Sequence, residues 1–395
     1  MHEFRGIIRH PPLVVSRTLS RSLDAVQQQE VTGEKARKAL GNLLHAALRL
    51  EFAVIPVYLS AGFSLKPGNG AIAQLLLRAA IEEMLHFTVV ANTLNAIGIA
   101  PDVKGAVPTF PCDVDVIEPP LRMELKPFSP DLVRDLLLRI ETPEDPIEFE
   151  ARSVERPRTV GQFYQGIIDI FEADTMPDLF DVDPTNLNVP VIPDPPAFRP
   201  TAYRDDNDEG EYPIPASIDF RITDRASVVR HLKWIVDQGE GTSRSDTNPI
   251  DISGLPAHYY RFVSILKGSY LVADEEAEKG FSYSGGSLRF DPAGVHESDP
   301  NPKAADYAEH ARLFQRMNGF NRTYSEMINA LAIAFGSRDG TAARAAYVRS
   351  ISSMRSMHNT MAPAIYREAG QALRPRQRQP RPAEVSGAAG ERADS

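Results

Sequence analysis

Cysteine and surplus positive charge are both scarce in this sequence. Its 395 residues include one cysteine, Cys112, so no disulfide can form within the chain. Nothing therefore requires an oxidising compartment, and a cytoplasmic setting is expected. The 43 Lys and Arg residues stand against 53 Asp and Glu, for a net charge of -10. Binding to a phosphate backbone needs clustered Lys and Arg, so nucleic acid is not an expected partner.

Segments that would enter a membrane are also missing. The N-terminus, Met1–Gly6, lacks the apolar region of a signal peptide. The uncharged stretch Phe52–Leu65 is too short to span a bilayer and is interrupted by Pro56. No membrane insertion is expected. The chain also has no GxxxxGK[ST], GxGxxG or GxSxG motif, so nucleotide binding and serine hydrolysis are not indicated.

Proline is unevenly distributed, and its distribution divides the chain. Of the 32 prolines, 19 lie between Pro101 and Pro215, whereas residues 31–100 contain only Pro56 and Pro67. With 42% apolar and 24% charged residues, the composition is that of a folded globular protein. Long helices are therefore expected on either side of the proline-rich stretch.

Apolar spacing predicts a series of helices. The expected helices are 32–63, 70–97, 159–173, 225–239, 256–271, 304–335 and 341–369. A glycine-rich hairpin is expected within 280–294, and the loop 177–215 is long enough to cover a site. The expected organisation is an N-terminal extension (1–30), one domain (31–370) with loop insertions, and a disordered tail (371–395). The insertions are placed at about 100–158, 174–224, 241–255 and 272–303.

Charged residues interrupt the apolar stripes of the first two long helices. Glu83 and His86 lie on the inward stripe of the second helix, and Glu51 lies on that of the first. A buried carboxylate must be paired, protonated or bound to metal. A Glu-x-x-His pair with a Glu from a neighbouring helix is the half-site of four-helix di-iron carboxylate proteins. These residues therefore predict a site for Fe, Mn or Zn.

Two alternatives accompany this prediction. Glu51 or Glu83 could instead pair with Arg49 or Arg78 in a buried salt-bridge network. Pro56 removes one helical hydrogen bond, which either bends the helix or opens room beside Glu51. A further apolar stripe is interpreted as core packing; it comprises Leu313, Met317, Phe320, Tyr324, Met327, Leu331 and Phe335.

Several segments together resemble the ferritin-like domain of the iminophenyl-pyruvate dimer synthase family. They are Leu50–Leu59, Ala80–Phe87, Val90–Gly98, Val160–Tyr164, Asp237–Gly241, His258–Phe262 and Phe320–Tyr324. The resemblance spans roughly residues 30–365, whereas the pathway enzymes that couple tryptophan-derived units are far longer than this chain. It implies an all-α, ferritin-like four-helix bundle with additional helices and long proline-rich loops.

The resemblance also implies a set of metal ligands. The first half-site is Glu51, Glu83 and His86, with Glu83 as the bridging carboxylate. In the second half-site, Glu240 has no His at i+3, so His258 is expected to replace it after a break in the fourth helix. Gln162 stands where the third helix would offer a Glu, which favours one tightly bound and at most one weaker ion. Glu240 could instead end its helix, and His258 could be a hydrogen-bonded core residue.

The expected function is that of a metal-dependent oxidoreductase acting on a small organic substrate, with an amino-acid derivative as a candidate. The expected cofactor is one or two iron ions, with manganese and haem as alternatives, and the co-substrate is O₂ or peroxide. Tyr58, Tyr164 and Tyr259 are expected near the metal residues, either as hydrogen-bonding or as redox groups. The rival functions are iron storage and a metal-free scaffold in a biosynthetic assembly, and homo-oligomerisation is left open.

Overall fold

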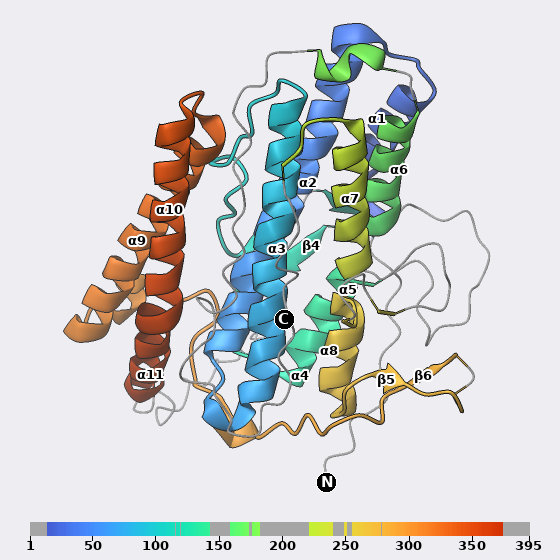
Figure 1. The fold of residues 1–395 in the computed structure, drawn as a ribbon. Helices are drawn as coiled ribbons and strands as arrows, with labels where there is room; N and C mark the ends of the chain where they lie inside the picture. The colour runs from blue at the N-terminus through green and yellow to red at the C-terminus, as the bar shows by residue number, and fades with distance from the viewer. Residues whose placement is uncertain are drawn as a thin grey trace, which may run out of the picture.

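Two long antiparallel helices form the centre of the molecule (Figure 1). The computed structural model describes residues 14–114, 116–118, 120–142, 159–173, 176–181, 221–239, 249–250, 255–277 and 279–373. Helix α2 (Gly33–Phe63) and helix α3 (Gly70–Ala96) are joined by a short 3-10 turn, η1 (Pro67–Asn69). A Cβ atom on Gly62 would lie 2.8 Å from a methyl carbon of Leu77, so glycine allows the two helices to approach closely here.

Helices α2 and α3 are buried on nearly all sides, because other helices cover both faces of the pair. By length and composition alone, α2 could cross a membrane, but 78% of its most apolar 18-residue window is buried inside the protein. The apolar surface of α2 is thus packed within the protein, as in the core helix of a bundle.

One face of the α2–α3 pair is covered by short helical segments, some toward one end of the bundle and some toward the other. Helices α6 (Val160–Glu172) and α7 (Arg225–Gly239) pack together toward one end of the bundle (Figure 1). Toward the other end, α8 (His258–Lys267) packs against a short helical run. This run consists of α4 (Pro130–Leu132), the π-helical turn η2 (Val133–Leu137) and α5 (Leu138–Ile140). The fourth bundle helix is therefore broken between Gly239 and His258, as the sequence predicts.

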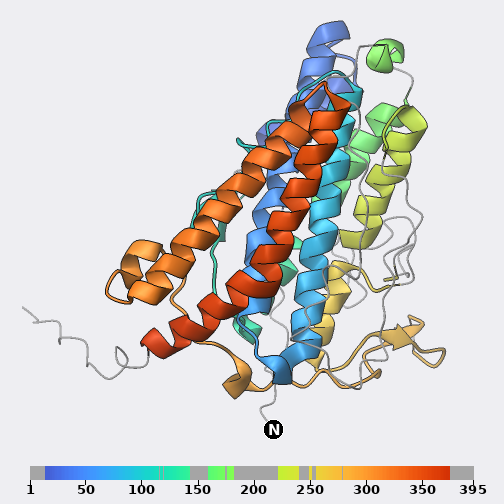
Figure 2. The same ribbon diagram turned by 60° about the vertical axis from the view of Figure 1, so that its left-hand side comes forward.

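The opposite face of the pair is covered by the C-terminal helices (Figure 2). Helix α9 (Ala311–Gly336) runs antiparallel to α10 (Gly340–Ser356), which continues through a π-helical turn, η8 (Met357–Met361), into α11 (Ala362–Leu373). The expected single helices 304–335 and 341–369 are thus each divided. Residues 304–307 form a separate 3-10 turn, η7 (Ala304–Tyr307), and α11 extends four residues beyond the expected end.

The remaining elements lie at the edges of the bundle. Helix α1 (Arg17–Gln27) packs on α2 and α6, within the segment expected to be an extension. Three antiparallel two-stranded ribbons pair β1 with β3, β2 with β4 and β5 with β6. The strands are β1 (Val14–Val15), β2 (Cys112–Val114), β3 (Ile117–Glu118), β4 (Leu121–Met123), β5 (Val272–Ala273) and β6 (Phe281–Ser282). The short 3-10 turns are η3 (Pro177–Phe180) and η6 (Pro292–Gly294).

The all-α class and the helical bundle predicted from the sequence are confirmed. Two expectations within this fold are wrong. The glycine-rich hairpin begins before Gly280, because its first strand is β5. The proline-rich stretch also contains a helical run, α4 to α5, that starts at Ser129 with a side-chain cap to the Leu132 N–H at 3.0 Å. Most of the loop 177–215 and the tail beyond Leu373 lie outside the described residues.

Candidate metal centre

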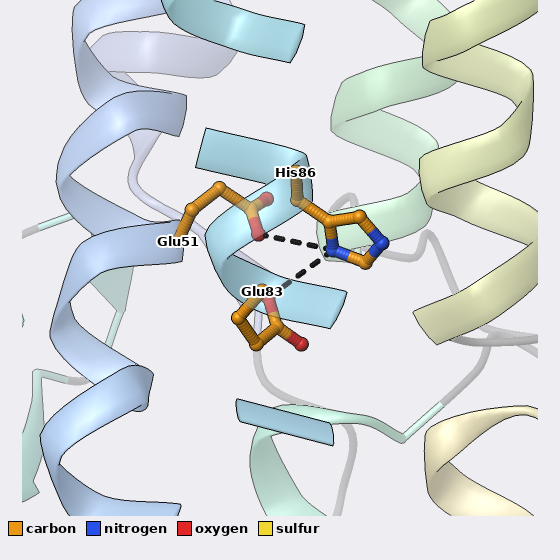
Figure 3. Close-up of side chains that lie close together, drawn as sticks. All are labelled: Glu51, Glu83 and His86. Atoms are coloured by element: carbon orange, nitrogen blue, oxygen red, sulfur yellow. Dashed lines mark hydrogen bonds and ion pairs between the residues drawn. The ribbon is translucent and has the colours of Figure 1, made fainter. Parts of the chain in front are cut away.

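Glu51, Glu83 and His86 meet between α2 and α3 (Figure 3). The Nδ1 atom of His86 lies 3.3 Å from Oε2 of Glu51 and 3.2 Å from Oε2 of Glu83. One potential ligand atom from each residue lies within 4.8 Å of the other two, and all three residues are buried. The i, i+3 spacing places Glu83 and His86 on one face of α3, opposite Glu51 on α2.

A second cluster uses the other oxygen of Glu83. The Nδ1 atom of His258 lies 2.9 Å from Oε1 of Glu83 and 3.6 Å from Oε1 of Glu141. These three buried residues also bring potential ligand atoms within 4.8 Å of one another. Glu141 directly follows α5, and His258 is the first residue of α8, so both lie at the ends of short helices. Glu83 is thus the residue common to both clusters.

Both histidines are oriented by a partner on the far side of the ring. Nε2 of His86 lies 2.9 Å from Oε1 of Gln238, and Nε2 of His258 lies 2.8 Å from Oε2 of Glu82. An Nε2–H that donates to these oxygens leaves the Nδ1 lone pair directed toward the carboxylate clusters. This arrangement, with an outer acceptor behind each imidazole, is typical of metal-binding histidines.

Glu82 is itself held in a buried ion-pair network. Its Oε2 lies 2.5 Å from Nη1 of Arg261, and its Oε1 lies 3.3 Å from Nε of Arg78. Burial acts to raise the pKa of Glu82, but Arg261 and His258 outweigh it, so this pKa lies well below its usual range. Arg78 therefore pairs with Glu82, the residue next to the predicted ligand Glu83.

The carboxylates of the two clusters crowd negative charge into a buried site. Burial, and then the charge of Glu83, raise the pKa of Glu51 to about 8. Burial acts to lower the pKa of His86, but Glu83 and Glu51 outweigh it and raise this pKa to about 10. Without a metal, protons on His86 and Glu51 offset this negative charge. A divalent cation could take the place of those protons.

Two tyrosines donate hydrogen bonds to carboxylate oxygens of the clusters. The hydroxyl of Tyr164 donates to Oε1 of Glu51, and that of Tyr58 donates to Oε1 of Glu141. Burial, together with the neighbouring carboxylates, raises the pKa of both hydroxyls, so both stay protonated as donors. Tyr259 instead packs edge-on against Tyr260, with ring centroids 5.1 Å apart.

The residues present fit divalent metal ions. A cavity of about 40 Å³ adjoins them and is lined by Glu51, Glu83, His86, Glu141 and Tyr164. His258 is fully buried, yet its Nδ1 atom makes no hydrogen bond of acceptable geometry to any described residue, although two carboxylates flank it. Three carboxylates and two imidazoles form a donor set that suits Fe, Mn or Zn.

The structure places the remaining sequence-predicted ligands differently. Gln162 lies in a capping box at the start of α6, where its Oε1 accepts the N–H of Thr159 at 2.9 Å. Its side chain therefore belongs to the helix cap and to neither cluster. Glu240 lies outside the described residues. His258 does lie at the site, although the carboxylates around it include Glu141, which the sequence pattern did not suggest.

Three residues of this candidate site were not predicted from the sequence, and each had a weak signal. Glu141 ends a leucine-rich helical run that opens with Ser129, Pro130 and Asp131, a common helix start. Glu82 precedes Glu83 and was masked by the stronger Glu-x-x-His pattern. Gln238 lies in the segment Asp237–Gly241, whose signal is its resemblance to the dimer synthase family, and its contact with His86 depends on tertiary packing.

Comparison with known proteins identifies the family of this chain. A ferritin-like protein from Caulobacter vibrioides is 20% identical in sequence, with a TM-score of 0.44 over 82% of this chain and 95% of its own. No curated protein matches this sequence. The model of the family described as Ferritin-like matches residues 44–267, a range that contains both clusters and more than half of the chain. The chain belongs to the Ferritin-like family.

Proposed function

We propose that this chain is a metal-dependent oxidoreductase that uses non-haem iron on a small organic substrate. The observation that carries the proposal is the pair of buried clusters that share Glu83, each with a histidine whose Nε2 faces an outer acceptor. A site for one structural ion would need neither the shared carboxylate nor the adjoining cavity.

In this proposal, each residue has a distinct task. Glu51, Glu83 and His86 would hold one ion, and Glu83, Glu141 and His258 would hold a second. Tyr164 and Tyr58 fix the orientation of Glu51 and Glu141 by donating to their carboxylate oxygens. The surrounding apolar side chains exclude water from the site. Bound iron would supply the exchange of electrons with O₂ or peroxide and with the substrate.

The substrate class follows from the sequence resemblance alone. Because the chain resembles the iminophenyl-pyruvate dimer synthase family in the segments that contain the ligands, we propose an aromatic amino acid or its keto or imino derivative as substrate. The proposal does not extend to the coupling reaction of the longer enzymes, because this chain is much shorter than they are.

The test is the oxidation of bound Fe(II). The protein is first loaded with Fe(II) in the absence of O₂. When it is mixed with O₂ alone, the bound iron should oxidise slowly. Oxidation of the iron should be faster when the right member of a panel of aromatic amino acids and their keto or imino derivatives is also present. His86→Ala should abolish this oxidation, whereas His231→Ala, at a buried histidine of α7 outside both clusters, should keep it.

Each rival function gives a different result in the same stopped-flow experiment. A storage protein would oxidise many Fe(II) ions per chain without an organic partner, so uptake beyond about two ions would refute the enzyme proposal. A scaffold would retain no iron. Unchanged oxidation in His86→Ala would refute the assignment of the site.

A further inference from the structure

A second, much larger cavity lies on the other side of the α2–α3 pair from the metal centre. Its volume is about 360 Å³, and its walls come from α2 and α3 on one side and α9, α10, η8 and α11 on the other. It shares no lining residue with the small cavity at the metal clusters. Phe52 and Phe87 line it, each one position after a proposed ligand, and pack edge-on with ring centroids 5.3 Å apart.

The cavity also explains two features of the sequence. The stripe Leu313–Phe335, interpreted as core packing, supplies part of the wall through Met317, Tyr324 and Met327. Pro56 is half-buried and lines this cavity, so it opens no room beside Glu51. Five of the nine methionines of the chain line the cavity, and unbranched methionine side chains adapt well to different ligands.

The lining specifies the charge of an occupant. No Asp, Glu, Lys or Arg is among the described residues that line the cavity. Its one histidine, His358, is buried, and this burial lowers its pKa to about 4, so the ring is neutral near pH 7. A charged ligand would therefore lose its hydration without gaining an ion pair.

The lining also specifies the chemical type and size of an occupant. Nine aromatic side chains line the cavity, a concentration well above their 8% share of the sequence. A cavity of roughly 150 Å³ holds one benzene ring, so this one has room for about two rings. Its volume lies in the usual range for small-molecule sites, roughly 300–1,000 Å³.

Two hydroxyl groups are available to a ligand in this apolar surrounding. Tyr324 and Tyr347 line the cavity, and neither hydroxyl has a hydrogen-bond partner among the described residues. Tyr366, by contrast, is already bonded to Ser60 at 2.7 Å. Tyr347 is buried and Tyr324 is half-buried, and a ligand oxygen or nitrogen could bond to either hydroxyl.

We propose that the cavity between α2–α3 and α9–α11 binds a neutral, largely aromatic molecule of about two rings, whose polar atom bonds to Tyr324 or Tyr347. The site is separate from the metal centre and does not depend on the proposed oxidoreductase activity. The cavity is partly open to solvent and lined mostly by apolar side chains, so an apolar occupant would displace water and add packing contacts.

Two fluorescent probes with the same ring system test the charge requirement. 2-Methylnaphthalene is neutral, whereas naphthalene-2-sulfonate carries one negative charge on the same two-ring framework. We expect the neutral probe to bind once per chain, at least about tenfold more tightly than the sulfonate, because the cavity offers the charge no partner. Equal affinities would overturn the proposal.

Matched phenylalanine substitutions test the location. Ala362 lines the cavity and is 3% exposed, so Ala362→Phe should fill it and weaken binding of the neutral probe by more than about tenfold. Ala345→Phe makes the same change at an exposed position of α10 and should leave the affinity unchanged. Circular dichroism and iron retention would verify that both variants fold. Unchanged binding in a folded Ala362→Phe protein would overturn the proposal.

Tyrosine variants keep the proposal falsifiable if Ala362→Phe does not fold. Tyr324→Phe or Tyr347→Phe should weaken binding of naphthol about 2- to 12-fold, the loss of one hydrogen bond, and leave methylnaphthalene unaffected. Unchanged naphthol affinity in both variants and in the double variant would overturn the proposed polar contact. Sedimentation at several protein concentrations tests whether another copy of the chain occupies the cavity instead. A dimer that the neutral probe dissociates would show that this is so and would overturn the proposal.

Discussion

The imidazole rings of His86 and His258 lie face to face, with centroids 5.8 Å apart and 27° between their planes. The two residues come from α3 and α8, and their Nδ1 atoms approach different oxygens of Glu83. One carboxylate therefore connects two histidines that are distant in the chain. Removing the Glu83 carboxylate should affect both clusters, whereas removing that of Glu51 or Glu141 should affect only one.

The first prediction is metal stoichiometry. Glu83→Ala should retain no iron, and Glu141→Ala should retain about one ion fewer than the unaltered chain, because only the second cluster uses Glu141. Protein loaded with Fe(II) without O₂ and then desalted would be measured by elemental analysis. Glu172→Ala, at a surface ion pair with Lys233, is the control and should retain the full amount. Equal retention by the unaltered chain and Glu83→Ala would end the metal hypothesis.

The second prediction concerns the residue behind His86. Gln238→Leu removes the acceptor for Nε2 of His86 and should lower metal affinity about 10- to 100-fold without removing a ligand. Gln238→Glu keeps an acceptor at that position and should restore much of the affinity. Titration with Co(II), followed by its visible spectrum, would measure both. If the Gln238→Leu and Gln238→Glu proteins bind Co(II) equally well, Gln238 does not orient His86.

The third prediction concerns stability. Arg261→Met removes the closest cation from Glu82, which is 2% exposed, and should lower the free energy of unfolding by about 3–5 kcal/mol. Arg312→Met breaks an ion pair whose arginine side chain is 78% exposed and should cost less than about 1 kcal/mol. Urea denaturation of the metal-free proteins would compare them. Similar losses in the two variants would show that the Glu82 network contributes no more than a surface pair.

The fourth prediction is a pH dependence from His358. Burial lowers its folded pKa to about 4 from an ordinary value of 6.5, so the unfolded chain takes up a proton at higher pH than the folded chain. Its contribution to stability is complete above pH 6.5 and is lost as the pH falls toward 4, in total on the order of 3 kcal/mol. His358→Phe should lose this part of the pH dependence. Parallel curves for the two proteins between pH 7 and 4 would contradict the assignment.

The sequence predicts most of the bundle because its long helices carry strong local signals. The helix 225–239 is predicted to the residue, and α2 and α3 to within one residue at each end, since apolar spacing and a glycine turn define them. The π-helical turns at Val133–Leu137 and Met357–Met361 are not predicted, because each spans only five residues, too few for a separate apolar periodicity to be recognised.

The candidate site is predicted only where its residues share a helix or a helical hairpin. Glu83 and His86 are recognisable because one turn of helix brings them together. Glu141 comes from a short segment whose position depends on packing against α8, and no spacing in the sequence specifies that contact. Gln162 was assigned to the metal from its expected place in the bundle, whereas its local sequence, Thr159 three residues earlier, already specified a helix cap.

The division of the ligands between near and distant parts of the chain has a consequence for folding. The first cluster is contained in residues 51–86, so it can form as soon as the α2–α3 hairpin has been synthesised and folded. The second needs Glu141 and His258, and closing the longer loop between Glu83 and His258 costs about 1.4 kcal/mol more in chain entropy. An ion in the first cluster would already neutralise Glu83 before His258 leaves the ribosome. The metal would then act as a nucleus onto which the later half of the chain assembles.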